Sequence, residues 1–374
     1  MSVLRLAVAV AALALAACSS SGGPKPAPLP ELPGAKDIRV LWSADAGSGE
    51  NYTFFPALNG EAIYVAARDG SVARLDAKTG AERWRANAER QLSGGVGADA
   101  STVAVATEEG EVIALDAATG KVRWRARASS EVLTPPTVGA GMVLVRTIDS
   151  RIFGFDAEDG KRRWVYQRSP GSLILRVATG VSILGETAYA GFSGGKLVAV
   201  ALSNGAQRWE ATVALPKGAN ELERVTDVVG EPALQGREVC AATYQGRVAC
   251  FETDTGKTLW ARELSSVTGV SVDARYAFVA DERGTVHAFD RSNGASVWKQ
   301  EKLSNRQLSL PRASGAVVVA GDFEGEIHFL ARDSGNFVGR FSAGGGPVRA
   351  APLVLASGGV LVQTQNGNLY ALSP

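Results

Sequence analysis

Histidine and cysteine, the usual side chains for metal binding and nucleophilic catalysis, are scarce in this chain of 374 residues. The two histidines, His287 and His328, share one position of a repeat described below, which favours packing over a metal site. The three cysteines form no adjacent pair and no Cys-x-x-Cys motif, and no Gly-x-Ser-x-Gly elbow or phosphate-binding loop is present. The sequence therefore predicts no catalytic residue, no metal and no cofactor.

An excess of charge of either sign is also lacking. Thirty-nine Lys and Arg stand against 38 Asp and Glu, without a run of like charges. Nucleic-acid-binding proteins usually carry a basic excess or stripe, and attachment to a membrane by charge needs a polybasic patch. Neither nucleic acid nor a charged membrane surface is therefore an expected partner.

Long hydrophobic runs are absent after residue 17. The apolar run 6–17 follows Arg5 and is twelve residues long, which suits a signal peptide better than a membrane span. It ends in Leu-Ala-Ala-Cys18, which resembles the lipobox of bacterial lipoproteins, where the cysteine is lipidated. We expect residues 1–17 to be a removed signal peptide and Cys18 to be the lipid anchor. An ordinary signal peptide with an incidental cysteine is the alternative.

Residues 18–36 are rich in Pro, Gly and Ser and lack a hydrophobic period, which predicts a flexible tether. Seventeen extended residues reach roughly 55 Å, enough to hold a folded body clear of a membrane. In the lipoproteins that this lipobox resembles, a serine such as Ser19 favours passage to the outer membrane. The mature chain is therefore expected there, lipid-anchored and facing the periplasm.

From residue 37 on, the sequence repeats itself. The segment Gly70 to Trp84 (GSVARLDAKTGAERW) matches Gly110 to Trp124 (GEVIALDAATGKVRW). A glycine followed four residues later by a tryptophan recurs in six copies: Gly80-Trp84, Gly120-Trp124, Gly160-Trp164, Gly205-Trp209, Gly256-Trp260 and Gly294-Trp298. A seventh copy has Gly339 in place of the tryptophan, and an eighth begins at Gly367. Such a period predicts a repeat architecture.

Each unit contains an apolar run such as 62–67, an alternating run such as 72–75, and a last strand with the tryptophan. A fainter strand such as 53–58 comes first, and glycine-containing turns separate the runs. Four strands in units of 38 to 51 residues predict an all-β fold. We expect one eight-bladed β-propeller of four-stranded antiparallel blades over residues 37–374.

The ends of the repeat predict how the ring closes. Residues 37–42 match the last strand of a unit that has no beginning, and the eighth unit lacks that strand. Pairing the two would leave no open edge. All seven tryptophans then share one position, which favours a packing role between blades over a ligand-stacking surface: Trp42, Trp84, Trp124, Trp164, Trp209, Trp260 and Trp298. The boundary at Gly339 is expected to be weaker.

Cys240 and Cys250 flank a predicted hairpin. An oxidising compartment would allow a disulfide between them. Two separate buried thiols fit the pattern equally well.

The frame Ala-x-Thr-Gly-x-x-x-Trp at residues 77–84 resembles the tryptophan-docking repeat of quinoprotein-like propellers. Two families share it, the quinone-dependent dehydrogenases and the B lipoproteins of the bacterial β-barrel assembly machine (the BAM complex). The lipobox and the isolated eight-unit propeller resemble the second family over essentially the whole mature chain. That resemblance implies a non-enzymatic scaffold that docks on a POTRA domain of the central barrel-assembly protein. Other subunits of the complex and unfolded outer-membrane proteins are further candidate partners.

The resemblance also implies a docking site on two loops. Leu173, Leu175 and Arg176 match the partner-binding residues of the family, and Asp227 matches an acidic position, whereas Val229 replaces a second acid. Two leucines beside charged groups suit an apolar anchor with a charged rim. Alternatively, the leucines face the core as strand residues and Arg176 pairs with Asp227 internally. A quinone-dependent enzyme and a propeller that binds cell wall or sugar remain the alternative functions.

Overall fold

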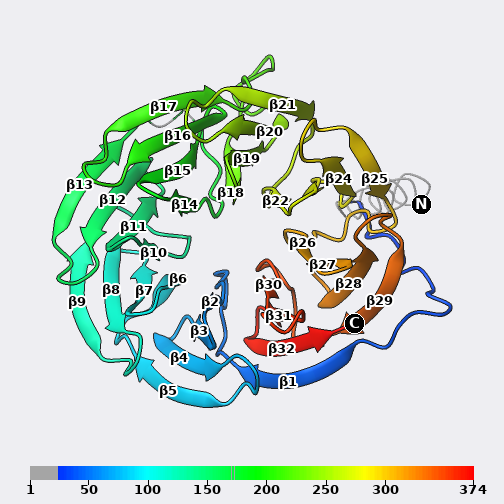
Figure 1. Cartoon of the computed structure of the whole chain (residues 1–374), viewed down its shortest axis with the longest axis horizontal. Coiled ribbons are helices and arrows are strands. Elements are labelled where there is room, and N and C mark those ends of the chain that lie inside the picture. Colours follow the sequence, from blue (N-terminus) through cyan, green and yellow to red (C-terminus); the bar gives the residue numbers. More distant parts are fainter. Residues whose placement is uncertain (1–23, 170, 172) are drawn as a thin grey trace, which may run out of the picture.

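The structure, a computed structural model, describes residues 24–169, 171 and 173–374. In these residues, eight four-stranded antiparallel sheets are arranged in a ring (Figure 1). The fold is an eight-bladed β-propeller, which confirms the predicted fold class. The expected signal peptide, residues 1–17, and the expected lipidation site Cys18 lie outside the described residues.

Blades 1 to 4 each take four consecutive strands of the chain. These are β2 (Ala57–Asn59), β3 (Ala62–Ala66), β4 (Ser71–Asp76) and β5 (Glu82–Asn87); β6 (Leu92–Ala98), β7 (Thr102–Thr107), β8 (Glu111–Asp116) and β9 (Val122–Arg127); β10 (Thr137–Gly139), β11 (Met142–Thr147), β12 (Arg151–Asp156) and β13 (Arg162–Gln167); and β14 (Val181–Leu184), β15 (Thr187–Phe192), β16 (Lys196–Ala201) and β17 (Gln207–Thr212).

Blades 5 to 7 follow the same rule, and blade 8 joins the two ends of the chain. The strands are β18 (Val228–Gln235), β19 (Glu238–Thr243), β20 (Arg247–Glu252) and β21 (Thr258–Glu263); β22 (Ser271–Val272), β23 (Tyr276–Ala280), β24 (Val286–Asp290) and β25 (Ser296–Gln300); β26 (Arg312–Ser314), β27 (Val317–Gly321), β28 (Glu326–Ala331) and β29 (Phe337–Ser342); and β30 (Leu353–Val354), β31 (Val360–Gln363), β32 (Asn368–Ser373) and β1 (Arg39–Asp45).

The N-terminal strand β1 closes the ring, as the sequence predicts. It pairs antiparallel with β32, from Arg39 opposite Ser373 to Asp45 opposite Asn368, and becomes the outermost strand of blade 8. Figure 1 shows the two colour extremes of the chain side by side at this point. In an open ring, β1 would be unpaired and β32 would have an exposed edge; their pairing removes both.

The repeated Asp-x-x-x-Gly segments make the turn between the third and fourth strands of a blade. In blade 1, the Oδ1 atom of Asp76 accepts hydrogen bonds from the backbone amides of Lys78 and Thr79 at 3.0 and 3.1 Å. Gly80 then takes a φ of +71°, a conformation that few other residues adopt without strain. The outermost strand with its tryptophan starts directly after this turn.

The tryptophans join neighbouring blades, in the packing role that the repeat predicts. Trp124 of blade 2 donates its indole N–H to the backbone carbonyl of Ala157 in blade 3 at 3.0 Å, and its ring covers Gly160. The glycine beneath each indole belongs to the next blade, not to the tryptophan's own. All seven tryptophans make the same pair of contacts, onto Gly80, Gly120, Gly160, Gly205, Gly256, Gly294 and Gly335.

The remaining boundary, between blades 7 and 8, lies at Gly339. A side chain there would meet Ile38 and the backbone carbonyl of Lys36, each 2.8 Å from the position of a Cβ atom. Phe341 of blade 7 and Tyr370 of blade 8 make an edge-to-face contact at 5.2 Å. The N-terminal segment thus fills the space that an indole occupies elsewhere.

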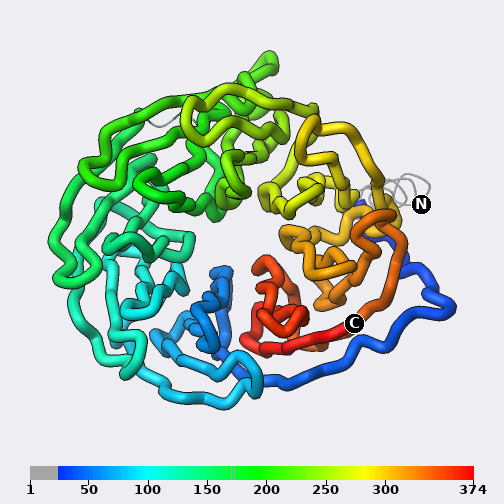
Figure 2. The backbone as a smooth tube through the Cα atoms, in the orientation of Figure 1, coloured from blue at the N-terminus to red at the C-terminus, as the bar shows by residue number. Residues whose placement is uncertain are grey.

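The predicted tether is attached to the ring over the part that the structure describes. Residues 24–36 run along the outer side of blade 7 (Figure 2). Ala27 bonds the backbone of Ser304, the Arg340 guanidinium donates to the carbonyl of Pro30, and Lys36 bonds Val338. At these contacts the segment is held by the ring and does not hang free. The residues that hold it lie some 300 positions away, so local composition did not indicate them.

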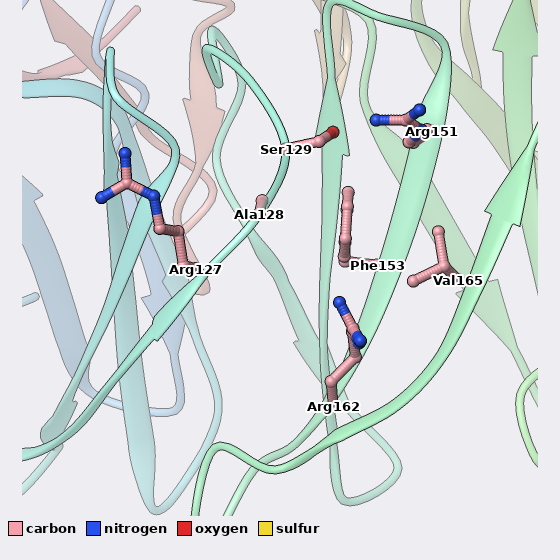
Figure 3. A pocket seen from close by; sticks show the side chains of 7 residues that line it. All are labelled: Arg127, Ala128, Ser129, Arg151, Phe153, Arg162 and Val165. Carbon is pink, nitrogen blue, oxygen red and sulfur yellow. The ribbon is translucent and has the colours of Figure 1, made fainter.

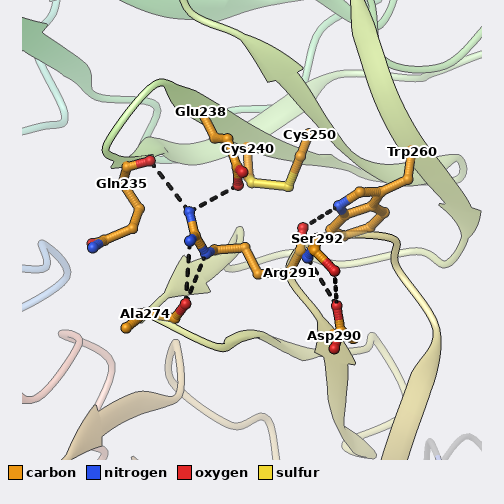
Figure 4. Close-up of a disulfide and its surroundings, with 9 residues drawn as sticks. All are labelled: Gln235, Glu238, Cys240, Cys250, Trp260, Ala274, Asp290, Arg291 and Ser292. Carbon is orange, nitrogen blue, oxygen red and sulfur yellow. Dashed lines mark hydrogen bonds and ion pairs between the residues drawn. A yellow bond between two sulfur atoms is a disulfide. The ribbon is translucent and has the colours of Figure 1, made fainter.

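Cys240 and Cys250 form a disulfide (Figure 4), which decides between the two interpretations of the sequence. They lie directly opposite each other on β19 and β20 and are almost fully buried. The bond staples the two middle strands of blade 5. In the same view, Trp260 of blade 5 donates to the carbonyl of Arg291 in blade 6.

The two histidines brace hairpins. His328 lies 3.0 Å from the Oδ2 atom of Asp322, and His287 lies 2.9 Å from the Oδ2 atom of Asp281. The other carboxylate oxygen of each aspartate accepts backbone N–H groups of the turn between the second and third strands. Their shared position in the repeat therefore reflects a shared structural role.

Candidate partner-docking surface

One face of the ring carries both of the predicted site loops. In blades 1 to 7 the chain passes through four antiparallel strands, from the innermost to the outermost. The first strand therefore begins at the same face of the ring at which the fourth strand ends, and the connections between blades lie at that face. The hairpins between second and third strands turn at this face too, and Ile148 of such a hairpin bonds the backbone of Glu131 in a connection between blades. Residues 173–177, the docking loop, connect blades 3 and 4 at this face.

The docking loop exposes apolar side chains to solvent. Leu173 and Ile174 are 44% and 40% exposed, and Leu175 is half-buried. The loop lies between β13 and β14, so Leu173 and Leu175 are not strand residues facing the core. Exposed leucine and isoleucine side by side favour a contact with another protein.

Asp227 is buried beside the docking loop and binds its backbone. Its Oδ2 atom accepts a hydrogen bond of 2.7 Å from the backbone amide of Leu175, and the residue is only 5% exposed. Burial raises the pKa of Asp227, and the amides of Leu175 and Gly194 act against that shift. The prediction that Asp227 forms a charged rim is therefore wrong, because the carboxylate is buried and serves as an acceptor for the loop.

Arg176 pairs with Glu131 rather than with Asp227. Its Nε and Nη2 atoms lie 3.1 and 2.5 Å from the two carboxylate oxygens of Glu131, a bidentate pair. The hydrogen bond from Arg176 to Glu131 raises the pKa of the guanidinium, whose side chain stays mostly exposed. The guanidinium is thus held in one orientation on the same loop as the exposed Leu173 and Ile174.

A second polar group supports this loop. The Tyr52 hydroxyl donates to Glu108, Arg68 pairs with the same carboxylate, and both Arg68 and Arg176 lie over the Tyr52 ring at 4.4 and 5.8 Å. Burial, together with the bond to Glu108, raises the pKa of Tyr52. The tyrosine therefore links hairpins of blades 1 and 2 to the docking loop.

The neighbouring connections add apolar surface that sequence reasoning missed. Leu215 and Leu222, in the connection between blades 4 and 5, are 64% and 72% exposed, and Val267 follows in the next connection. Isolated leucines beside polar and charged residues such as Lys217 and Glu223 are the signal that would have indicated them. Val229 is buried in β18, so the position of the missing second acid is not at the surface.

The face combines a fixed apolar loop with a cationic edge, which suits recognition of a protein surface. Among the described residues, no group of three or more His, Cys, Asp or Glu side chains could hold a metal ion. Over the same residues, no helix is long and apolar enough to cross a membrane.

Comparisons with known proteins agree on one family. Residues 68–300 match the family model described as outer membrane protein assembly factor BamB. The protein of that name from Bordetella pertussis is 45% identical over 333 residues, which cover 89% of this chain and 86% of that protein. The one from Pseudomonas aeruginosa is 47% identical, covering 87% and 88%.

Solved structures give the same result. The crystal structure of BamB from Moraxella catarrhalis superposes with a TM-score of 0.82 at 27% identity, covering 90% of this chain and all of that one. A quinohemoprotein alcohol dehydrogenase from Comamonas testosteroni reaches a TM-score of 0.69 at 15% identity, covering 90% and 76%. At that identity the likeness concerns the fold alone.

Proposed function

This chain belongs to the family of the outer membrane protein assembly factor BamB, and on that premise we propose that its ring is a non-enzymatic docking scaffold in outer-membrane protein assembly. The observation that carries the proposal is the docking loop. Two exposed aliphatic side chains and a guanidinium are held in place by buried or paired acids, Asp227 and Glu131. Such pre-ordering lowers the entropy lost when a partner binds.

The proposed partner is a POTRA domain of the central barrel-assembly protein. Leu173 and Leu175 supply the apolar anchor, and Arg176 supplies a charge that an acidic group of the partner would meet. Asp227 contributes by orienting Leu175 and does not touch the partner. Leu222 of the neighbouring connection extends the apolar surface.

Anchoring through a lipid on Cys18 is a further part of the proposal. Near the start of the described residues, Lys25 and Ala27 bond Asn305 and Ser304 in the connection between blades 6 and 7. This connection lies on the face of the docking loop. Seven residue steps from Cys18 to Lys25 reach about 25 Å at most, so the lipid would hold that face near the periplasmic surface of the outer membrane.

Capture of the purified barrel-assembly protein tests the docking proposal. The double variant Leu173→Ala/Leu175→Ala and the single variant Arg176→Ala should each weaken capture about tenfold or more, the usual loss at a central interface residue. Leu184→Ala is the matched control, because Leu184 is similarly exposed but lies in a hairpin on the opposite face. Unchanged capture by the docking-loop variants, or equal loss with Leu184→Ala, would overturn the assignment.

The non-enzymatic part of the proposal has a separate test. The described residues do not fit a quinone enzyme, since they lack a cluster of acidic ligands for calcium and their two cysteines form a buried disulfide within one blade. Adding quinone and calcium should therefore give neither cofactor absorbance nor dye-linked oxidation of alcohols or glucose. Either signal would contradict the scaffold function.

A further inference from the structure

The outer side of the ring has a groove between blades 2 and 3, with a volume of about 240 Å³ (Figure 3). Three arginines and two apolar side chains dominate its lining. They come from the end of β9, from β12 and from β13: Arg127, Arg151, Phe153, Arg162 and Val165. In Figure 3, Arg162 points along the groove toward Phe153.

The repeat explains why the groove is open at this boundary. At the two preceding boundaries, the residue after the tryptophan is an arginine that reaches back across the gap. Arg85 donates to the carbonyl of Asp45, and Arg125 donates to the carbonyl of Ala88, both at 2.9 Å. The corresponding residue here is Val165, which has no donor and is too short to cross. The space that a guanidinium fills elsewhere is therefore left free.

The first residue of the third strand also has the opposite charge here from the one it has at the preceding blade boundary. At the boundary between blades 1 and 2, Glu111 at the start of β8 pairs with Arg90 and Arg125. The same position at the start of β12 is Arg151, whose one ion pair among the described residues is with Asp149 at 2.7 Å. Within the described part of the chain, Arg127 and Arg162 make no side-chain hydrogen bond or ion pair. The groove thus presents two cations that no acid of the described residues neutralises, Arg127 and Arg162, beside Arg151, of which only Nη1 is paired with Asp149.

The spacing of these side chains along β12 and its partner strand β13 determines the length and shape of a ligand that would fit. Arg151 opens the strand, Phe153 pairs with Val165, and Arg162 lies opposite Phe155. At about 3.3 Å per residue, the two arginine positions lie about 13 Å apart, with the apolar pair between them. A single phosphate group is too small to occupy this length, whereas an extended peptide places every second side chain on one face.

We propose that this groove binds an extended acidic peptide segment with the pattern acid-x-apolar-x-acid. The two carboxylates meet the guanidinium groups of Arg151 and Arg162, with Arg127 on the opposite wall, because arginine binds carboxylates through paired N–H groups. The apolar side chain between them packs on Phe153 and Val165. None of the residues that line the groove belongs to the docking loop.

Fluorescence anisotropy with the whole mature chain and a labelled Gly-Glu-Ser-Leu-Ser-Glu-Gly peptide tests the proposal. Arg162→Ala and Arg127→Ala should each weaken binding about tenfold, as expected for a charge-assisted hydrogen bond. Replacing both glutamates of the peptide by glutamine should abolish binding, and about 1 M salt should weaken it strongly.

Val165→Arg is the decisive variant, because it adds a cation yet refills the groove as Arg125 does at the preceding boundary. The proposal requires that it abolish peptide binding. Val122→Arg adds the same charge at an exposed position outside the groove and should leave binding unchanged. If Val165→Arg binds the peptide as well as the wild type or better, the attraction is only general charge and the groove is not the site.

Two further arms of the experiment distinguish a peptide site from a phosphate or lipid site and from the docking loop. Inorganic phosphate or vesicles of anionic phospholipid that displace the peptide at low micromolar concentration would overturn the assignment to a peptide. Leu173→Ala/Leu175→Ala should bind the acidic peptide normally, so that failure of the docking surface and failure of the groove give different results.

Discussion

The Oδ2 atom of Asp227 accepts a hydrogen bond from the backbone amide of Leu175, and thereby ties together two loops that are 52 residues apart. A buried carboxylate is used here to fix the position of an exposed loop. The proposed docking surface therefore depends on two connections between blades, and one of the residues that order it is almost fully buried.

Asp227→Ala should weaken partner capture about tenfold, because loss of this hydrogen bond frees the docking loop. Asp227→Asn keeps an oxygen acceptor for the Leu175 amide and should retain most of the affinity. Binding assays with the barrel-assembly protein, alongside hydrogen exchange of residues 173–177, measure both effects. Wild-type affinity in the alanine variant with faster exchange would show that loop order is not needed.

Gly160→Ala should destabilise the ring by about 3 kcal/mol or more. The glycine has a φ of +72°, and a Cβ atom would lie 2.6 Å from the Trp124 ring, so both backbone strain and a clash with the indole result. Gly185→Ala is the control, since its φ is +56° and nothing lies within 4 Å of the added Cβ. It should cost only about 1–2 kcal/mol of backbone strain. Urea unfolding of both variants measures the two losses of stability. Equal losses would contradict a stabilising role of the contact between the indole and Gly160.

Removal of the disulfide with Cys240→Ala/Cys250→Ala should lower the free energy of unfolding by about 2–3 kcal/mol, as expected for a closed loop of this short length. Urea unfolding with and without dithiothreitol measures the difference. The reductant should destabilise the wild type and leave the double variant unaffected. A variant as stable as the oxidised wild type would show that blade 5 does not need the bond.

Stability should fall in acid, partly through His328 and Asp322. Burial lowers the pKa of His328 below its usual 6.5. Below pH 6.5 the unfolded chain takes up a proton that the folded chain resists, so the stabilisation present above that pH declines as the pH falls. Burial acts to raise the pKa of Asp322, but bonds from His328 and Arg306 outweigh it and hold the pKa below 3.8. Its contribution is present above pH 3.8 and is lost as the pH falls through the folded-state value.

The variant His328→Gln removes the imidazole while keeping a side chain that can donate to Asp322. Its free energy of unfolding should change less between about pH 7 and pH 5 than that of the wild type. Denaturant titrations at several pH values supply the comparison. If the free energy of unfolding changes with pH to the same extent in both proteins, His328 does not contribute to the acid sensitivity.

The architecture follows from the sequence because each blade repeats the same local chemistry. Asp76 and Gly80 define a turn within five residues, and Trp84 follows at a fixed distance. Six copies with the tryptophan, a seventh without it and an incomplete eighth were therefore enough to predict the ring and its closure. The glycine that each indole covers was not predictable from one copy, because it lies one blade further on.

The candidate site depends on contacts that no local pattern contains. Arg176 could have paired with Asp227, but its partner Glu131 lies 45 residues earlier and was not singled out. The burial of Asp227 results from the packing of two loops, and loop packing has no period in the sequence. Residues 24–36 have the composition of a free linker, yet Arg340 and Asn305 bind them from the far end of the chain.

Closure by β1 also sets an order of events during biogenesis. Arg39 meets its partner Ser373 only after roughly 330 further residues have been made, and joining such distant segments costs about 5 kcal/mol of chain entropy. Until then, β1 has an unpaired edge and the indole of Trp42 has only blade 1 to cover. Before blade 8 is complete, the chain would be an arc of seven blades in which β1 lacks its partner strand. Its last six-residue strand, β32, would convert an aggregation-prone arc into a closed ring.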